Sequence, residues 1–146
     1  MPLMSRSIAF SFALAVGGLT STLAQAQTTE VVASGLQNPW GMAFVDGGVL
    51  VTERPGRMRV VGPDGRLGQP LAGLPPIDAG GQGGLLDLVT DRAFATNRTV
   101  YFCYSEPAAS GGANSTAMAS AKLSADATRL DDVKVVFSQQ PKVNSR

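Results

Sequence analysis

The 146-residue chain has no histidine and a single cysteine. Without an imidazole it lacks the side chain best suited to act as a general base near neutral pH. Cys103 has no partner for an internal disulfide, so the fold does not depend on one. Because Cys103 lies in the apolar run VYFCY, we interpret it as a small buried hydrophobe, with a reactive thiol as the alternative.

The sequence also lacks an excess of charge of either sign. It carries 12 basic and 11 acidic residues, and Arg6 is the only charged residue among the first 26. Binding to nucleic acid or to an anionic membrane calls for a clustered basic excess. Neither is therefore an expected partner.

No apolar run is long enough to be interpreted as a membrane span. The run Ile8–Leu19 falls short of the roughly 20 residues that a spanning helix needs, and two glycines interrupt it. Arg6 before this run and the small-x-small pattern of Ala24–Ala26 after it are typical of a cleaved secretory signal. We predict a signal peptide over 1–26, a mature domain over 27–146, and a periplasmic or secreted protein; a membrane anchor is the alternative.

The mature chain lacks the spacing of a long amphipathic helix and instead alternates short apolar runs with tight turns. Asp-Gly and Pro-Gly pairs separate runs of five or six residues, which indicates antiparallel hairpins. We therefore predict an all-β fold. The expected strands cover residues 40–45, 49–54, 58–62, 85–90, 99–106, 115–123 and 133–138.

Two of these strands differ in how they are expected to be buried. In VYFCY, Val100, Phe102 and Tyr104 lie on one face and Tyr101 and Cys103 on the other, so this strand should be covered on both faces. In 115–123, small apolar residues alternate with polar ones, which is typical of an outer, half-exposed strand. Residues 66–84, before the fourth strand, form an unusually long loop of 19 residues, and long loops in compact domains are often functional.

The strand groups recur with a period that favours a β-propeller. They open at Trp40 and Gly84, roughly 44 residues apart, and a four-stranded blade takes roughly 40 to 50 residues. A propeller also explains apolar character on both faces, because each blade packs between two neighbours. The mature chain has room for only about two to three blades, so we predict an incomplete propeller whose end blades expose faces meant for neighbours, with poor solubility as a consequence.

Several motifs, in the same order, resemble the N-terminal third of the soluble glucose/sorbosone dehydrogenase family, the periplasmic quinoproteins also called aldose sugar dehydrogenases. The resemblance extends over about 31–143. The motifs that carry it are GLQNPWGMAF, VLVTERPGRMRVV, LAGLPPIDAGGQGGLLDL, FATNRTVYFCYSE and NSTAMASAKLS.

The resemblance implies a six-bladed propeller with pyrroloquinoline quinone (PQQ) and calcium on its top face. It implies oxidation of aldose sugars at the anomeric carbon to lactones, with a histidine as base, hydride transfer to the quinone, and an external electron acceptor. The family's catalytic histidine and most cofactor and calcium ligands lie beyond the matching segment. We therefore expect the chain alone to be inactive, with no catalytic residue of its own. A non-enzymatic propeller fragment that binds carbohydrate or protein is the alternative, and a lactonase-type propeller is a weaker one.

The same resemblance implies that Gln82, in the Gly-Gln-Gly-Gly segment, contacts the cofactor or substrate. Its amide offers both a donor and an acceptor, which suits a quinone carbonyl or a sugar hydroxyl. We expect Gly81, Gly83 and Gly84 to be mainly structural, by letting backbone approach closely. From spacing alone, a solvent-facing turn is the competing interpretation. The segment does not match a phosphate-binding G-x-G-x-x-G motif.

The remaining candidate residues have simpler interpretations. We expect Glu53 and Arg54 to form an exposed charge pair at a hairpin end, and a position lining the rim is the alternative. Trp40 should pack between blades rather than serve as a sugar platform. Asp87 and Asp91 would lie about 13 Å apart along one strand, too far to share a calcium ion, so we assign no metal ligand.

Overall fold

The computed structural model of the chain describes residues 27–144, and the predicted signal peptide lies outside these residues. Residues 31–144 belong to one compact unit, whereas residues 27–30 fall outside it and have no regular secondary structure. Within the described residues no helix is long and apolar enough to cross a membrane.

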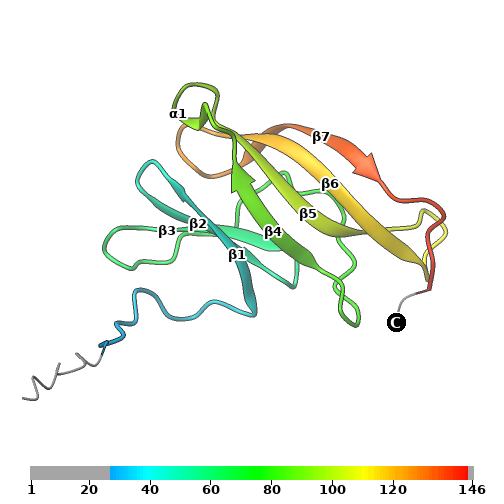
Figure 1. Ribbon diagram of the computed structural model, residues 1–146, viewed down its shortest axis with the longest axis horizontal. Helices are drawn as coiled ribbons and strands as arrows, with labels where there is room; N and C mark the ends of the chain where they lie inside the picture. Colours follow the sequence, from blue (N-terminus) through cyan, green and yellow to red (C-terminus); the bar gives the residue numbers. More distant parts are fainter. Residues whose placement is uncertain (1–26, 145–146) are drawn as a thin grey trace, which may run out of the picture. The chain divides into compact units, whose positions relative to one another are not determined.

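The compact unit is built from two antiparallel sheets (Figure 1). The first has the order β1-β2-β3 and the second the order β4-β5-β6-β7, so every strand pairs with its neighbour in sequence. A four-residue helix, α1, lies in the turn between β4 and β5. The elements are β1 (Pro39–Val45), β2 (Gly48–Glu53), β3 (Arg57–Val61), β4 (Leu85–Thr90), α1 (Phe94–Asn97), β5 (Thr99–Pro107), β6 (Asn114–Leu123) and β7 (Leu130–Ser138).

The all-β prediction is confirmed, and each predicted strand overlaps an observed one. The sheets contain three and four strands, so they amount to two blade-sized units; closure into a propeller stays a prediction. The alternation in 115–123 is also confirmed, because Ala117, Ala119 and Ala121 are buried. Its assignment to an outer strand is wrong, since β6 pairs with both β5 and β7.

The sequence pattern did not predict the helix α1, because the interactions that hold this helix are made by the turn that precedes it. The Asp91 carboxylate accepts hydrogen bonds from the Ala93 amide at 2.8 Å and from the Asn97 side chain at 2.9 Å. Phe94 is buried against the core, and the Arg98 guanidinium lies over its ring at 5.6 Å. One turn of helix held in this way has no periodicity that a sequence pattern could reveal.

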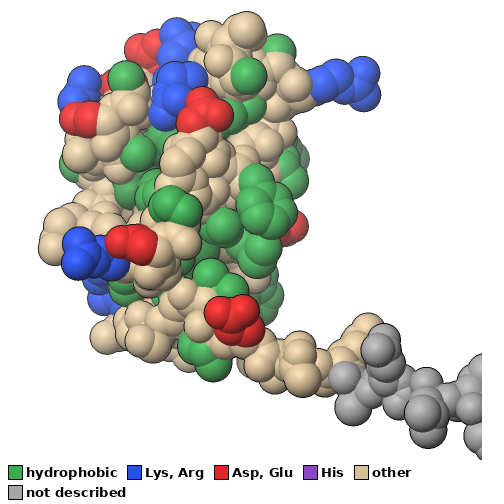
Figure 2. Space-filling view, turned by 90° about the vertical axis from the view of Figure 1, so that its left-hand side faces the viewer, with side chains coloured by type: hydrophobic (Ala, Val, Ile, Leu, Met, Phe, Trp, Pro, Cys, Tyr) green, Lys and Arg blue, Asp and Glu red, His purple; other side chains and the backbone are tan. Residues whose placement is uncertain are grey.

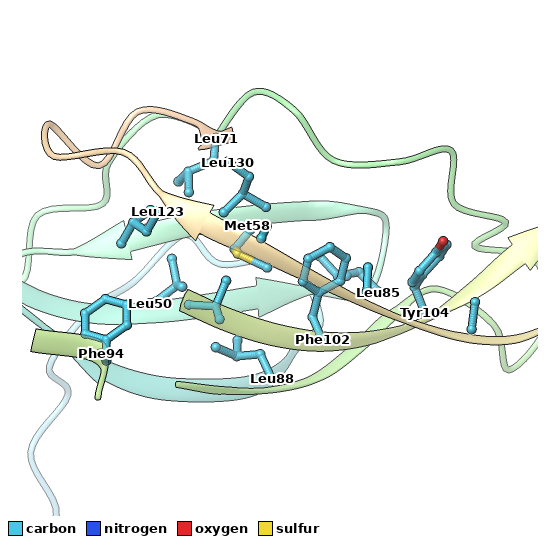
Figure 3. Packing of buried hydrophobic residues seen from close by; sticks show 14 residues of the cluster. Leu50, Met58, Leu71, Leu85, Leu88, Phe94, Phe102, Tyr104, Leu123 and Leu130 are labelled. Atoms are coloured by element: carbon cyan, nitrogen blue, oxygen red, sulfur yellow. The ribbon is translucent and has the colours of Figure 1, made fainter. Parts of the chain in front are cut away.

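The hydrophobic core lies between the two sheets (Figure 3). Leu50 and Met58 enter it from the first sheet, and Leu85, Phe102 and Tyr104 from the second. The sheets make contact along β1, β2 and β4. The loop between β3 and β4 completes this core with three apolar side chains, Leu71, Leu74 and Ile77.

The outer faces of both sheets carry exposed apolar side chains. Trp40, Met42 and Phe44 project from β1 with 57, 59 and 75 % of their surface exposed. On the side drawn in Figure 2, hydrophobic side chains form a band between charged ones. These exposed side chains agree with the prediction that an incomplete propeller exposes faces of its end blades, and the packing of Trp40 between blades stays a prediction.

The outer face of the second sheet is only partly covered. Tyr101 and Cys103 are half-buried and, with Val89 and Met118, line a shallow cavity of about 70 Å³. The prediction that VYFCY is covered on both faces thus fails on one of them. The same finding corrects the view of Cys103 as fully buried; it is a half-buried free thiol.

Candidate cofactor-facing loop

The glycine-rich loop 79–84 immediately precedes β4, at the end of the sheets where β2 and β5 finish (Figure 1). The Gly83 amide donates to the Gly80 carbonyl at 2.9 Å, which closes a four-residue turn. Gly81 takes a φ of +57°, a conformation that favours glycine. Gln82 lies at the tip of this turn.

The Gln82 side chain is exposed to solvent. Within residues 27–144 its amide makes no hydrogen bond, so its donor and acceptor groups are both available to a ligand. This position fits both interpretations of the sequence, a cofactor contact and a solvent-facing turn. The role of Gln82 as a cofactor ligand stays a prediction.

The second sheet anchors the loop through Ser105 of β5 and through Asn114 of β6, which bonds to Asp78 just before the loop. The Ser105 amide donates to the Gly84 carbonyl at 2.9 Å, and the Gly84 amide donates to Ser105 Oγ at 3.2 Å. The Asp78 amide donates to the Ser105 carbonyl, and its carboxylate accepts from the Gly80 amide and from Asn114. Both ends of the loop are therefore fastened to β5 and β6.

The first sheet holds the tip of the loop through Arg54, which follows β2. Arg54 Nη1 donates to the Gly81 carbonyl at 2.7 Å and to the Gly83 carbonyl at 3.1 Å. The Arg54 carbonyl also accepts from the Leu85 amide at 3.0 Å. The predicted surface pair between Glu53 and Arg54 is wrong, because Arg54 bonds to this loop and Glu53 turns to other arginines.

The glycines of the loop are required by close packing at two positions. A Cβ on Gly84, whose φ is +143°, would lie 2.2 Å from the Arg54 carbonyl oxygen. A Cβ on Gly83 would lie 2.7 Å from the Asp78 carbonyl oxygen. Real Cβ atoms do not approach this closely, so the expectation that these glycines are structural is confirmed. The backbone atoms that Gly84 and Gly83 approach belong to Arg54 and Asp78, respectively.

Glu53 is the centre of a buried ionic cluster beside this loop. Its side chain is 0 % exposed and accepts from Arg57 Nε and Arg59 Nε at 2.9 Å each, and from the Gln37 amide. Burial alone raises the pKa of Glu53, but the hydrogen bonds from Arg57, Gln37 and Arg59 and the charge of Arg57 outweigh it. The net pKa lies below the ordinary value, so the carboxylate is ionised at neutral pH.

A second charged cluster lies where the chain leaves β7. Lys142 Nζ hydrogen-bonds to Glu106 and, at 3.0 Å, to Ser115 Oγ, while Ser138 also donates to Glu106. The hydrogen bonds from Lys142 and Ser138 hold the pKa of Glu106 below its ordinary value. Glu106 is thus an ionised carboxylate at neutral pH, and its pairing with Lys142 makes it a weak base.

A cavity of about 400 Å³ opens beside Glu106. Pro75, Pro76, Tyr104 and Val135 contribute to its largely apolar walls. Burial, and then the charge of Glu106, raise the pKa of Tyr104, so its hydroxyl remains protonated at neutral pH. No pattern in the sequence pointed to this cavity, because its walls come from three separate segments.

The structure places Asp87 and Asp91 apart from the glycine-rich loop. Asp87 lies exposed in β4 and its carboxylate accepts from the Leu88 amide at 2.9 Å, while Asp91 caps the turn before α1. In the described part of the chain, no three His, Cys, Asp or Glu side chains are grouped as a metal site would require. That Asp87 and Asp91 hold no calcium stays a prediction.

Comparison with known proteins matches residues 36–146 to a family model described as glucose/sorbosone dehydrogenase. The aldose sugar dehydrogenase YliI of Escherichia coli is 39 % identical over 132 residues, which cover 87 % of this chain and 35 % of that protein. The protein slr1608 of Synechocystis is 40 % identical over 129 residues, covering 79 % of this chain and 30 % of that protein. The chain thus spans about a third of the length of the curated relatives it matches.

Solved structures show the same partial match. A glucose dehydrogenase crystal structure is 44 % identical and superposes with a TM-score of 0.76, covering 80 % of this chain and 34 % of that one. The apo-form of the soluble aldose sugar dehydrogenase from E. coli gives a TM-score of 0.72 at 39 % identity, covering 77 and 33 %. The PQQ-bound form of aldose sugar dehydrogenase from Streptomyces coelicolor shares the fold, with a TM-score of 0.65 at 24 % identity over 79 and 34 %.

Proposed function

Because the chain belongs to the glucose/sorbosone dehydrogenase family, we propose that it is the N-terminal part of an exported, PQQ-dependent aldose sugar dehydrogenase. The reaction is oxidation of an aldose at its anomeric carbon to a lactone, in the periplasm or outside the cell. An external electron acceptor then reoxidises the cofactor. Identity near 40 % to an aldose sugar dehydrogenase supports this proposal.

The single observation that carries the proposal is the loop 79–84. It presents Gln82 to solvent on a turn whose backbone is fastened from both sheets. PQQ supplies an ortho-quinone that accepts a hydride when it is bound. The chemistry of this loop fits such a group, because an amide can donate to a quinone oxygen and accept from a sugar hydroxyl.

The part played by this chain is to bind and orient the cofactor, and proton abstraction falls to other residues. The sequence has no histidine. The carboxylates of Glu53 and Glu106 are both paired with cations and both have lowered pKa values, which makes them weaker bases. Calcium is also proposed for the whole enzyme, and none of the described residues is assigned as its ligand.

Titration of the purified chain with PQQ, followed by quinone absorbance and by tryptophan fluorescence, tests the proposal. The Gln82→Ala variant should bind PQQ about tenfold more weakly, as expected for the loss of a side-chain hydrogen bond to a polar ligand. Gln69→Ala is the matched control, because Gln69 is an exposed glutamine in the same long loop. It should leave the affinity unchanged.

The proposal fails if the unaltered chain binds no PQQ, or if Gln82→Ala binds it as well as the unaltered chain does. Binding of an aldose without any binding of PQQ would favour a non-enzymatic carbohydrate-binding role instead. Addition of aldose and an artificial electron acceptor to the PQQ-loaded chain should give no turnover, since the chain carries no base for the sugar hydroxyl.

A further inference from the structure

We infer that Arg54 is a positioning residue that fixes the direction in which Gln82 is presented. The inference concerns a contact between the two sheets and deepens the proposed function, on which its ligand measurement rests. Arg54 follows β2 in the first sheet, whereas Gln82 precedes β4 in the second. The arginine therefore acts across the boundary between the sheets.

The contact is specific to the peptides around Gln82. Arg54 Nη1 donates to the Gly81 carbonyl, which belongs to the peptide bond preceding Gln82. The same nitrogen donates to the Gly83 carbonyl, one residue beyond Gln82. The peptide bond between Gln82 and Gly83 is fixed by the turn hydrogen bond from Gly83 to Gly80. The peptides on both sides of Gln82 are thus oriented, and they set the direction of its Cα–Cβ bond.

No other side chain can replace this restraint. Gly80, Gly81, Gly83 and Gly84 have no side chains, so the tip of the loop cannot be held by packing of its own. Among residues 27–144, no other arginine or lysine donates a hydrogen bond to residues 79–84. In Arg54→Gln the loop keeps its fastening to Ser105 and the backbone hydrogen bond from the Leu85 amide, but it loses the side-chain hydrogen bonds from the first sheet to its tip.

The arginine is itself well placed to act as a rigid support. Its amide donates to the Asn38 carbonyl at 3.0 Å and its carbonyl accepts from the Leu85 amide at 3.0 Å. A Cβ on Gly84 would lie 2.6 Å from Arg54 Cγ, so the arginine stem lies directly against the loop backbone. Both the main chain and the side chain of Arg54 therefore define where the loop lies.

Hydrogen–deuterium exchange tests the restraint without any ligand. Arg54→Gln should speed amide exchange in residues 79–84 by about tenfold, because it removes a charge-assisted hydrogen bond to each of two carbonyls. Exchange in β5 and β6 should stay as in the unaltered chain. Arg54→Lys, which keeps the charge and can reach one carbonyl, should give an intermediate rate. Arg66→Gln is the control, since Arg66 lies in an exposed pair with Asp64.

A double-mutant cycle in PQQ affinity separates positioning from general stabilisation. Arg54→Gln should weaken PQQ binding about tenfold in the unaltered chain. It should change the affinity by less than about twofold when Gln82→Ala is already present, because Arg54 then has nothing to position. A purely structural arginine would lower the affinity equally in both backgrounds.

The outcomes are separable. Unchanged exchange at residues 79–84 in Arg54→Gln overturns the inference whatever the chain binds, and so do equal losses of affinity in the two backgrounds. If the unaltered chain binds no PQQ, the proposed function fails. The exchange experiment then decides alone whether Arg54 orders the Gln82 turn.

Discussion

The two faces of the sheets carry similar apolar side chains, yet those that point outward from β1 and β7 are exposed. Phe102 on the inner face of β5 is 1 % exposed, whereas Phe137 on the outer side of β7 is 53 % exposed. Within β1 the contrast falls between neighbours, because Ala43 packs against the core while Phe44 points outward. Hydrophobicity therefore indicates a face that can be buried, and the presence of a packing partner decides whether it is.

The outer face of the first sheet is buried in part, because Val51, Val61 and the ionic cluster of Glu53 lie on it and are not exposed. Thr52 faces the second sheet, where its hydroxyl hydrogen-bonds to the Leu86 carbonyl at 2.6 Å. Its neighbour Glu53 therefore points to the outer face, and it is nonetheless fully buried. The buried part of that face thus combines a paired charge with two valines, whereas the apolar side chains of β1 are exposed.

The largest expected effect separates the two faces directly. Phe102→Ala should lower the free energy of unfolding by about 3–5 kcal/mol, because it leaves a cavity between the sheets. Phe137→Ala, the matched change on the outer face, should cost less than about 0.5 kcal/mol. Urea denaturation followed by circular dichroism measures both. Comparable losses in the two variants would mean that the outer face is packed in solution.

The next largest effect tests the ionic cluster of Glu53. Glu53→Ala leaves Arg57 and Arg59 without their shared carboxylate and should cost about 3 kcal/mol in urea denaturation. Asp64→Asn is the control, because the pair of Asp64 with Arg66 is exposed and should contribute little. A Glu53→Ala variant as stable as the Asp64→Asn variant would show that the cluster does not hold the outer face.

A smaller effect comes from the protonation of Glu53. Its pKa is lowered in the folded chain from the ordinary value of 4.5, so its stabilising contribution is complete above pH 4.5 and is lost as the pH falls through the lowered value. Stability should therefore decline as the solution is acidified below about pH 4.5. In Glu53→Gln that decline should be shallower, as measured by melting temperature across a pH series. An identical pH profile in the two proteins would contradict this assignment.

The fold was largely predictable because its signals are local. Asp46-Gly47 and Pro55-Gly56 mark hairpin turns, and the strands on either side contain five to seven residues. The expected boundaries lie within three residues of the observed ones for every strand. The predictions that failed concern which strands and side chains pack against one another. The strand 115–123 looked like an outer strand, and its alternation does not reveal that β6 pairs on both sides.

The candidate site was predictable only in part. Gln82 came from the resemblance to a family, and spacing alone favoured an ordinary turn. Arg54 could not be found, because the carbonyls that it binds lie 27 and 29 residues further along the chain. The burial of Glu53 was missed for the same reason. Its partners Gln37, Arg57 and Arg59 converge only once the hairpin has formed.

The smallest effect on stability is expected on the open face of β1. Phe44→Lys should change the free energy of unfolding by less than about 0.5 kcal/mol, since Phe44 is 75 % exposed and leaves no cavity. It should nevertheless reduce self-association, because a charge interrupts the apolar row formed with Trp40 and Met42. Sedimentation velocity over a concentration series measures this, with Thr116→Lys on exposed polar surface as the control. A loss of more than about 2 kcal/mol in Phe44→Lys would show that this face is covered after all, because only a buried aromatic residue destabilises a fold that strongly when it is replaced.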